Sequence, residues 1–205
     1  MLTLVLAATV GFTPADFFPL SMGRRAVFEE RSVVPSITTD VVSETVTIGG
    51  RKAVKVTTFN GSEPKPSDKP ISTAFYAAEA DAVYLVSYST DDPLPLPMPI
   101  LKVGEKKLTW DYEGPASSNR VAEPVKMKSE SQLLPPRDVL GSKVDILEVK
   151  STATMGAGAA RETIEQRSTY AKGIGLIELT SKTTVGKRSV ESSLKLIKVQ
   201  TPGGS

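Results

Sequence analysis

The stretch that decides the fold is Ile37-Thr-Thr-Asp-Val-Val-Ser-Glu-Thr-Val-Thr-Ile48, followed by Gly49-Gly50 and by Arg51-Lys-Ala-Val-Lys-Val-Thr-Thr-Phe59. On both sides of the glycine pair, β-branched and polar residues alternate with period two, which is typical of half-buried antiparallel strands. A glycine pair between two such runs accepts the positive φ angles of a tight hairpin turn. The stretch therefore predicts two long antiparallel strands joined by a two-residue turn.

The same alternation continues along the chain, and helical periodicity is almost absent. It predicts an all-β fold, either a strongly curved antiparallel sheet that forms an open half-barrel or a sandwich, with meander connections. Leu133-Leu-Pro-Pro136 is a candidate division between two sheet segments, but one β-rich domain over residues 16–205 is the preferred prediction. The expected strands are 24–32, 37–48, 52–59, 72–80, 83–89, 107–112, 121–129, 144–155, 160–171, 175–184 and 189–200.

Two glycine-containing segments, Met155-Gly-Ala-Gly158 and Val185-Gly-Lys187, are predicted as hairpin tips. The first also resembles part of a dinucleotide-binding fingerprint. That fingerprint needs a third glycine or alanine where Arg161 stands, and a helix after it. A hairpin tip is therefore the better interpretation, and no nucleotide cofactor is expected.

The composition excludes several kinds of chemistry. The 205 residues include no cysteine and no histidine, so disulfides, thiolate nucleophiles, the usual zinc sites and imidazole-based triads are all excluded. Lys and Arg number 25 against 23 Asp and Glu, and a net charge of +2 does not indicate a nucleic-acid partner. No Gly-x-Ser-x-Gly nucleophile motif is present. The prediction is a protein that is not an enzyme and has no metal and no cofactor.

The amino terminus indicates export. Residues 1–10 are uncharged and largely apolar, and Gly11-Phe-Thr-Pro-Ala15 then supplies a breaker and a small residue, as at a signal-peptide cleavage site. A helical membrane span needs about 20 residues, so no integral membrane span is expected. We predict a signal peptide over residues 1–15 and a periplasmic or extracellular bacterial protein. The alternative is a buried amino-terminal strand, with Leu2, Leu4 and Leu6 on one face.

Pro93-Leu-Pro-Leu-Pro-Met-Pro99 is the most unusual segment of the chain. Alternating prolines favour a polyproline II conformation and remove backbone donors, which predicts an extended edge or a loop. Leu94, Leu96 and Met98 of this strip, together with Trp110, the only tryptophan, are the candidate contacts for a ligand or partner. In the alternative interpretation, the strip is a crossover whose apolar side chains pack on the core, and Trp110 is a core anchor.

Three segments resemble a family of poorly characterised exported bacterial proteins. They are the Phe-Pro-Leu opening with its following glycine at 17–28, the Leu-Lys-Val-Gly to Trp segment at 99–110, and Tyr170-Ala-Lys-Gly-Ile-Gly-Leu-Ile-Glu178. Ala26 and Lys172 depart from the pattern, which more often has an aromatic residue and a proline there. The resemblance implies a fold similar to the LolA-like half-barrel of periplasmic lipoprotein carriers. It carries no catalytic residues.

Together these observations predict a non-enzymatic exported envelope protein that binds an apolar ligand or a lipoprotein segment in a concave sheet. The alternative prediction is a structural or assembly protein that uses its edge strands or the Pro93–Pro99 strip. A hydrolase is a remote third alternative.

Overall fold

The computed structural model describes residues 11–115, 124–156 and 161–202. A short helix, α1 (Pro14–Phe17), precedes twelve strands. The strands are β1 (Arg25–Arg31), β2 (Ser36–Ile48), β3 (Arg51–Asn60), β4 (Ser72–Ala78), β5 (Val83–Ser87), β6 (Pro93–Leu101), β7 (Leu108–Pro115), β8 (Pro124–Val139), β9 (Ser142–Met155), β10 (Glu162–Ala171), β11 (Gly175–Val185) and β12 (Arg188–Gln200).

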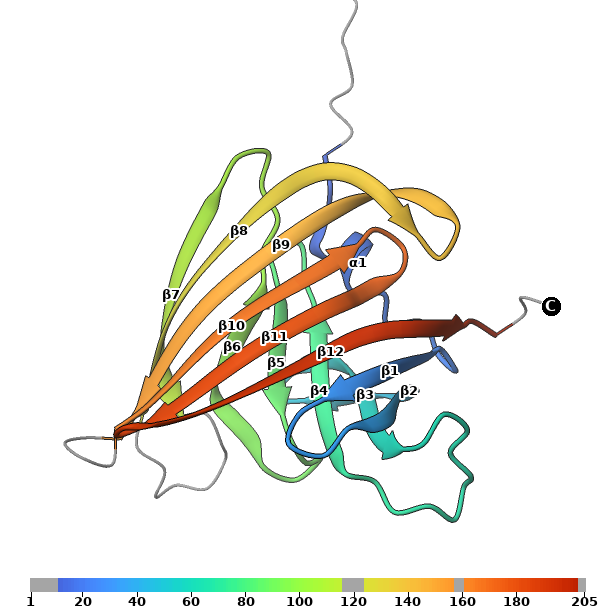
Figure 1. Cartoon of the computed structure of the whole chain (residues 1–205), viewed down its shortest axis with the longest axis horizontal. Helices are drawn as coiled ribbons and strands as arrows, with labels where there is room; N and C mark the ends of the chain where they lie inside the picture. Colours follow the sequence, from blue (N-terminus) through green and yellow to red (C-terminus); the bar gives the residue numbers. More distant parts are fainter. Residues whose placement is uncertain (1–10, 116–123, 157–160, 203–205) are drawn as a thin grey trace, which may run out of the picture.

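All twelve strands belong to one antiparallel sheet with the order β6-β5-β4-β3-β2-β1-β12-β11-β10-β9-β8-β7. The sheet consists of two meanders, β1–β6 and β7–β12, and the pairing of β1 with β12 joins them. It curves until it is nearly closed into a barrel, with β8–β12 as one wall and β4–β6 behind them (Figure 1). The one unsealed seam lies between β6 and β7, the two ends of the strand order.

Period-two alternation determines which side chains face the inside of the barrel. On β7 and β8, Trp110, Tyr112, Met127 and Ser129 are buried, and the residues between them are exposed or half-buried. Trp110 lies opposite Ser129, and Ser129 lies opposite Ser151 on β9, so the buried face runs continuously across the three strands. This agrees with the expectation that one face of each strand is covered and the other is hydrated.

The prediction of a curved all-antiparallel sheet with meander connections is confirmed, and so is the Gly49-Gly50 turn. Both glycines have positive φ, 55° and 78°, and β2 pairs with β3 directly across them. The Val185–Lys187 tip is also confirmed, with Val185 opposite Arg188. These turns depend on residues adjacent in sequence, so local chemistry is sufficient to predict them.

Both proline segments lie within strands of the sheet. Pro93–Pro99, predicted as an extended edge or a loop, forms most of β6, which is a terminal strand of the sheet order and pairs with β5 through an irregular register. Leu133–Pro136 does not divide the sheet. Strand β8 runs through it, and a register shift between Leu134 and Arg137 accommodates the two prolines. An edge position and a bulge are the two places where a sheet tolerates proline.

The helix α1 has no counterpart among the predicted elements. The backbone N–H of Thr13 donates to Asp16 Oδ2 over 2.7 Å, and Pro14 occupies the first turn. The predicted cleavage site after Ala15 lies within α1, and cleavage there stays a prediction. Residues 1–10, and residues 157 and 158 of the Met155–Gly158 tip, lie outside the described residues.

Candidate functional site

The seam between β6 and β7 is held by side chains instead of a backbone ladder. Pro93, Pro95, Pro97 and Pro99 have no N–H to donate, so β6 cannot complete a regular ladder with β7. Instead, Trp110 Nε1 on β7 donates to the Pro99 carbonyl oxygen over 3.1 Å. This side-chain hydrogen bond joins β7 to β6 where the two strands form no backbone ladder.

Tyr112 makes the second contact across the seam. Its hydroxyl lies 3.1 Å from the Leu96 carbonyl oxygen and 2.8 Å from that of Pro115. Gly114 makes room for this hydroxyl, because a Cβ at Gly114 would lie 2.6 Å from Tyr112 Oη and 3.3 Å from Leu96 Cδ2. Sequence reasoning missed Tyr112, although its position two residues after Trp110 on an alternating strand places both rings on one face.

The four predicted contact residues have different environments. Leu94 is buried, with 4% of its surface exposed, while Leu96 is 47% exposed. Met98 packs against the cluster of Tyr112, Val125 and Met127. Trp110 packs in the interior cluster that contains Phe17. The structure therefore brings Leu96, Met98 and Trp110 to the seam, and Leu96 is the one with a large exposed surface.

Replacing Tyr112 with phenylalanine tests the seam. The change removes the hydroxyl, whose single hydrogen is shared between the Leu96 and Pro115 carbonyls, so the free energy of unfolding should fall by about 1–2 kcal/mol in urea titrations. The matched control is Tyr84→Phe, which removes an exposed hydroxyl that donates to Asp81 over 2.7 Å. It should cost less than about 0.5 kcal/mol. Equal losses in the two variants would show that Tyr112 does not hold the seam.

An aromatic segment fills one end of the barrel. Phe17 of α1 is fully buried and packs with Val83 and Leu101 of β5 and β6, and with Leu147 and Val149 of β9. It therefore lies between the two walls, where Figure 1 shows α1 behind β9–β11. We call residues 12–20 the plug.

The plug is attached mainly through its rings. Phe12 packs edge-on against Phe17 with ring centroids 5.6 Å apart, and Phe18 packs 5.1 Å from the Tyr76 ring and 6.2 Å from the Tyr170 ring. The Asp16 carbonyl accepts a hydrogen bond from the Gly173 N–H over 2.7 Å. Burial raises the pKa of Tyr170 to about 12 and also raises that of Tyr76, so both phenols stay neutral.

A cavity of about 50 Å³ remains beside the plug. We call it the chamber. One arginine and one aspartate face it, and most of its other lining is apolar. Its lining residues are Phe18, Pro19, Leu20, Arg24, Phe28, Asp40, Val42, Val56, Gly175 and Leu176.

Each of the two charged residues of the chamber has its own hydrogen-bond partner. Arg24 is 7% exposed, and its Nη2 donates to the Ile174 carbonyl oxygen. Asp40 on β2 accepts a hydrogen bond from Thr58 Oγ1 over 2.6 Å. Burial raises the pKa of the Asp40 carboxyl and lowers that of Arg24, although each charge partly offsets the shift of the other. The sequence patterns did not single out either residue.

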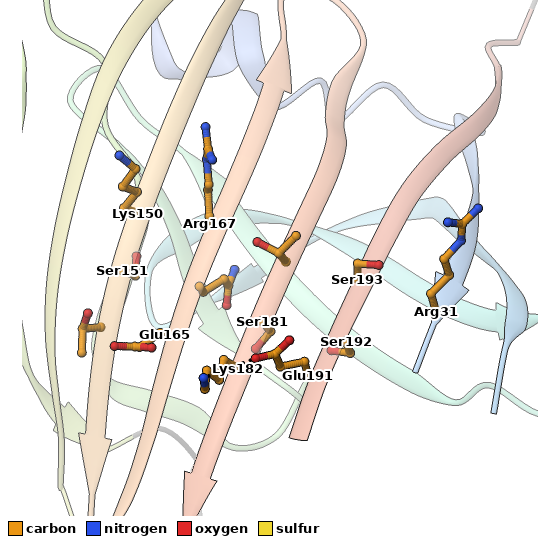
Figure 2. Close-up of a pocket in the computed structure, with 13 residues that line it drawn as sticks. Arg31, Lys150, Ser151, Glu165, Arg167, Ser181, Lys182, Glu191, Ser192 and Ser193 are labelled. Carbon is orange, nitrogen blue, oxygen red and sulfur yellow. Dashed lines mark ion pairs between the residues drawn. The ribbon is translucent and has the colours of Figure 1, made fainter. Parts of the chain in front are cut away.

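A second, polar hollow of about 540 Å³ is lined by residues of β9–β12 and by Arg31, and Figure 2 shows its lining. Long charged side chains surround a floor of serine and threonine. Lys182 pairs with Glu191 over 3.3 Å, while Lys150 and Arg167 both pair with Glu148, which is 3% exposed. Arg31 pairs with Glu29 over 3.2 Å. Each cation of this hollow thus already has a carboxylate partner on the sheet.

Within residues 11–115, 124–156 and 161–202, no three acidic side chains converge in a group that could hold a metal ion. In the same residues, no helix has the length and apolar character needed to cross a membrane.

Comparison with known proteins shows similarity in the path of the backbone alone. No protein-family model matches the chain, and no curated protein matches it. The chain is similar to the crystal structure of a "putative lipoprotein" from Parabacteroides distasonis, with 13% identity, a TM-score of 0.49 and coverage of 90% of this chain and 98% of that one.

It is also similar to a "putative exported protein with YmcC-like fold" from Bacteroides fragilis, with 10% identity, a TM-score of 0.46 and coverage of 90% and 99%. Both TM-scores are below 0.5, so neither similarity supports an argument about this chain. Its resemblance to exported bacterial proteins and to lipoprotein carriers stays a prediction.

Proposed function

We propose that this chain is a non-enzymatic exported protein that binds an apolar ligand inside the barrel, in the space that the plug occupies in this structure. The observation that carries the proposal is the composition of the interior. Phe12, Phe17 and Phe18 enter it from a short segment outside the sheet, and they pack against rings and aliphatic side chains of both walls. An apolar ligand could replace these contacts with similar ones.

The unsealed seam supports the same proposal. A fully paired barrel would have to break backbone hydrogen bonds to widen, whereas two side-chain donors, Trp110 and Tyr112, hold the contact between β6 and β7. The chamber of about 50 Å³ is too small for a chain-like ligand, since one water in the liquid takes up about 30 Å³. Binding therefore requires displacement of the plug.

The test uses 1-N-phenylnaphthylamine, an apolar dye whose fluorescence rises when it leaves water. We expect saturable binding to the wild-type protein, and several-fold tighter binding to Phe18→Ala, because removing this ring enlarges the chamber. The fluorescence of Trp110 should change in the same titration, since Trp110 lies in the cluster of Phe17.

Phe59→Ala is the matched control, since Phe59 lies on β3 and does not line the chamber. It should bind the dye as the wild type does. The absence of saturable binding in both the wild type and Phe18→Ala would overturn the proposed function. Equal tightening in Phe59→Ala would place the dye elsewhere on the molecule and would also overturn it.

A further inference from the structure

The chamber has one feature that an apolar binding site does not need. This feature is a buried guanidinium with an unused hydrogen-bond donor. Arg24 has five N–H donors. Its Nη2 binds the Ile174 carbonyl, but its Nε is buried without a hydrogen-bond partner. A buried charged group without full hydrogen bonding is costly, so this arrangement needs an explanation.

Asp40 does not provide that explanation. It lines the same chamber, but it makes no direct hydrogen bond or ion pair with Arg24 among the described contacts, and its Oδ1 is engaged by Thr58. The two charged groups thus line one cavity of about 50 Å³. A small polar group in this cavity could contact both of them.

The surroundings of Arg24 keep its side chain in place. A Cβ on Gly175 would lie 3.2 Å from Arg24 Nη2 and 3.2 Å from Pro19 Cδ, so glycine at this position leaves room for the guanidinium and for the plug. The rest of the lining includes Phe18, Phe28 and Leu176, which are apolar. A ligand whose polar end enters this chamber is therefore surrounded mostly by apolar side chains and needs an apolar remainder.

We propose that Arg24 and Asp40 form the polar end of the binding site and hold the carboxyl group of a long-chain carboxylic acid. The Arg24 guanidinium, including its free Nε–H, donates to the ligand carboxylate, as in other charge-assisted pairs. Asp40, which lines the same chamber and accepts a hydrogen bond from Thr58, lies beside the bound carboxyl group. The inference rests on the proposed function, because the apolar chain of the ligand needs the space that the plug fills.

The test compares dodecanoate with dodecan-1-ol, which has the same chain length and no charge, by isothermal titration. We expect the wild type to bind dodecanoate about tenfold more tightly than dodecan-1-ol, because only the carboxylate forms charge-assisted hydrogen bonds with Arg24. Arg24→Gln should lose this preference while it still binds the alcohol. Asp40→Asn should keep the preference, because the Arg24 guanidinium that binds the carboxylate is unchanged.

A second measurement needs no variant. The Nε–H resonance of Arg24 in ¹⁵N-arginine-labelled wild type should shift when dodecanoate is added and should stay in place with dodecan-1-ol. This keeps the inference testable even if Arg24→Gln does not fold.

Equal affinity of the wild type for the acid and the alcohol would overturn the carboxylate site and leave the proposed function intact, with the chamber holding only water. A preference that survives in Arg24→Gln, or a resonance that neither ligand moves while both bind, would also overturn it. Binding of neither ligand would instead defeat the proposed function itself.

Discussion

Replacing Phe17 with alanine is expected to lower the free energy of unfolding by about 3–5 kcal/mol, the cost of a large cavity in a packed core. Phe17 has no exposed surface, and it contacts side chains of both barrel walls. A four-residue helix has little stability of its own, so its packing alone keeps it in place. Urea unfolding monitored by circular dichroism measures the loss.

The same variant tests whether the plug occupies a site for apolar ligands. A cavity lined by Leu147, Val149 and Val83 stays dry and can take up a small apolar molecule. Saturating benzene should therefore raise the melting temperature of Phe17→Ala by several degrees, and clearly more than that of the wild type, in which Phe17 fills this space. Phe59→Ala provides the control for loss of a phenylalanine that packs in none of the interior clusters. A loss below about 1 kcal/mol in Phe17→Ala would mean that the plug is not part of the core.

Replacing Glu148 with glutamine should lower the free energy of unfolding by about 2 kcal/mol at neutral pH. Glu148 is 3% exposed and is bound by Lys150 over 3.1 Å, by Arg167 and by Gln132. Breaking a fully buried ion pair costs about 3–5 kcal/mol. Here Lys150 and Arg167 are 46% and 60% exposed, so water can solvate them after the ion pairs are lost, and the expected loss of stability is smaller.

The pH dependence of this effect follows from the pKa of Glu148. Burial raises that pKa, but the hydrogen bonds and charges of Lys150 and Arg167 outweigh burial, and the net pKa is lowered from 4.5. A carboxyl whose folded-state pKa is depressed stabilises the protein above its unfolded-state pKa. The difference between wild type and Glu148→Gln should be constant above about pH 5.5 and shrink as the pH falls below about 4.5.

Glu130→Gln is the matched control for this prediction, since Glu130 pairs with Lys107 over 2.6 Å on a more exposed part of the sheet. It should cost less than about 0.5 kcal/mol at any pH. If both variants lose the same free energy, or if the Glu148→Gln deficit grows toward acid pH, Glu148 does not act as a buried ion-pair partner.

The strand content could be predicted because long stretches of the strands, as on β7 and β8, alternate buried and exposed residues. The alternation in Ile37–Ile48 and the glycine pair after it are local patterns, and the structure confirms the hairpin they predict. The structure of Pro93–Pro99 could not be predicted in the same way. Prolines lack the backbone N–H, and this is compatible both with a loop and with an edge strand. Only the seam, where Trp110 and Tyr112 donate to β6 carbonyls, decides in favour of an edge strand.

The candidate site was only partly predictable. Trp110 and Leu96 stand out by composition and lie at the seam. Arg24 and Asp40 lie on neighbouring strand segments, yet nothing in their local sequence distinguishes them from solvated charges. Thr13 and Asp16 flank Pro14 in the pattern of a helix start, but α1 is too short to produce a periodicity.

The sequence by itself determined the antiparallel β class, the main turns and the absence of histidine and cysteine chemistry, because these depend on residue type and on nearest neighbours. The tertiary structure alone decided that the sheet nearly closes, that β1 pairs with β12, and that an aromatic plug and a buried Arg24 share the interior. These features join residues up to 175 positions apart, as in the pairing of Arg25 with Gln200, and no local pattern encodes a contact at that distance.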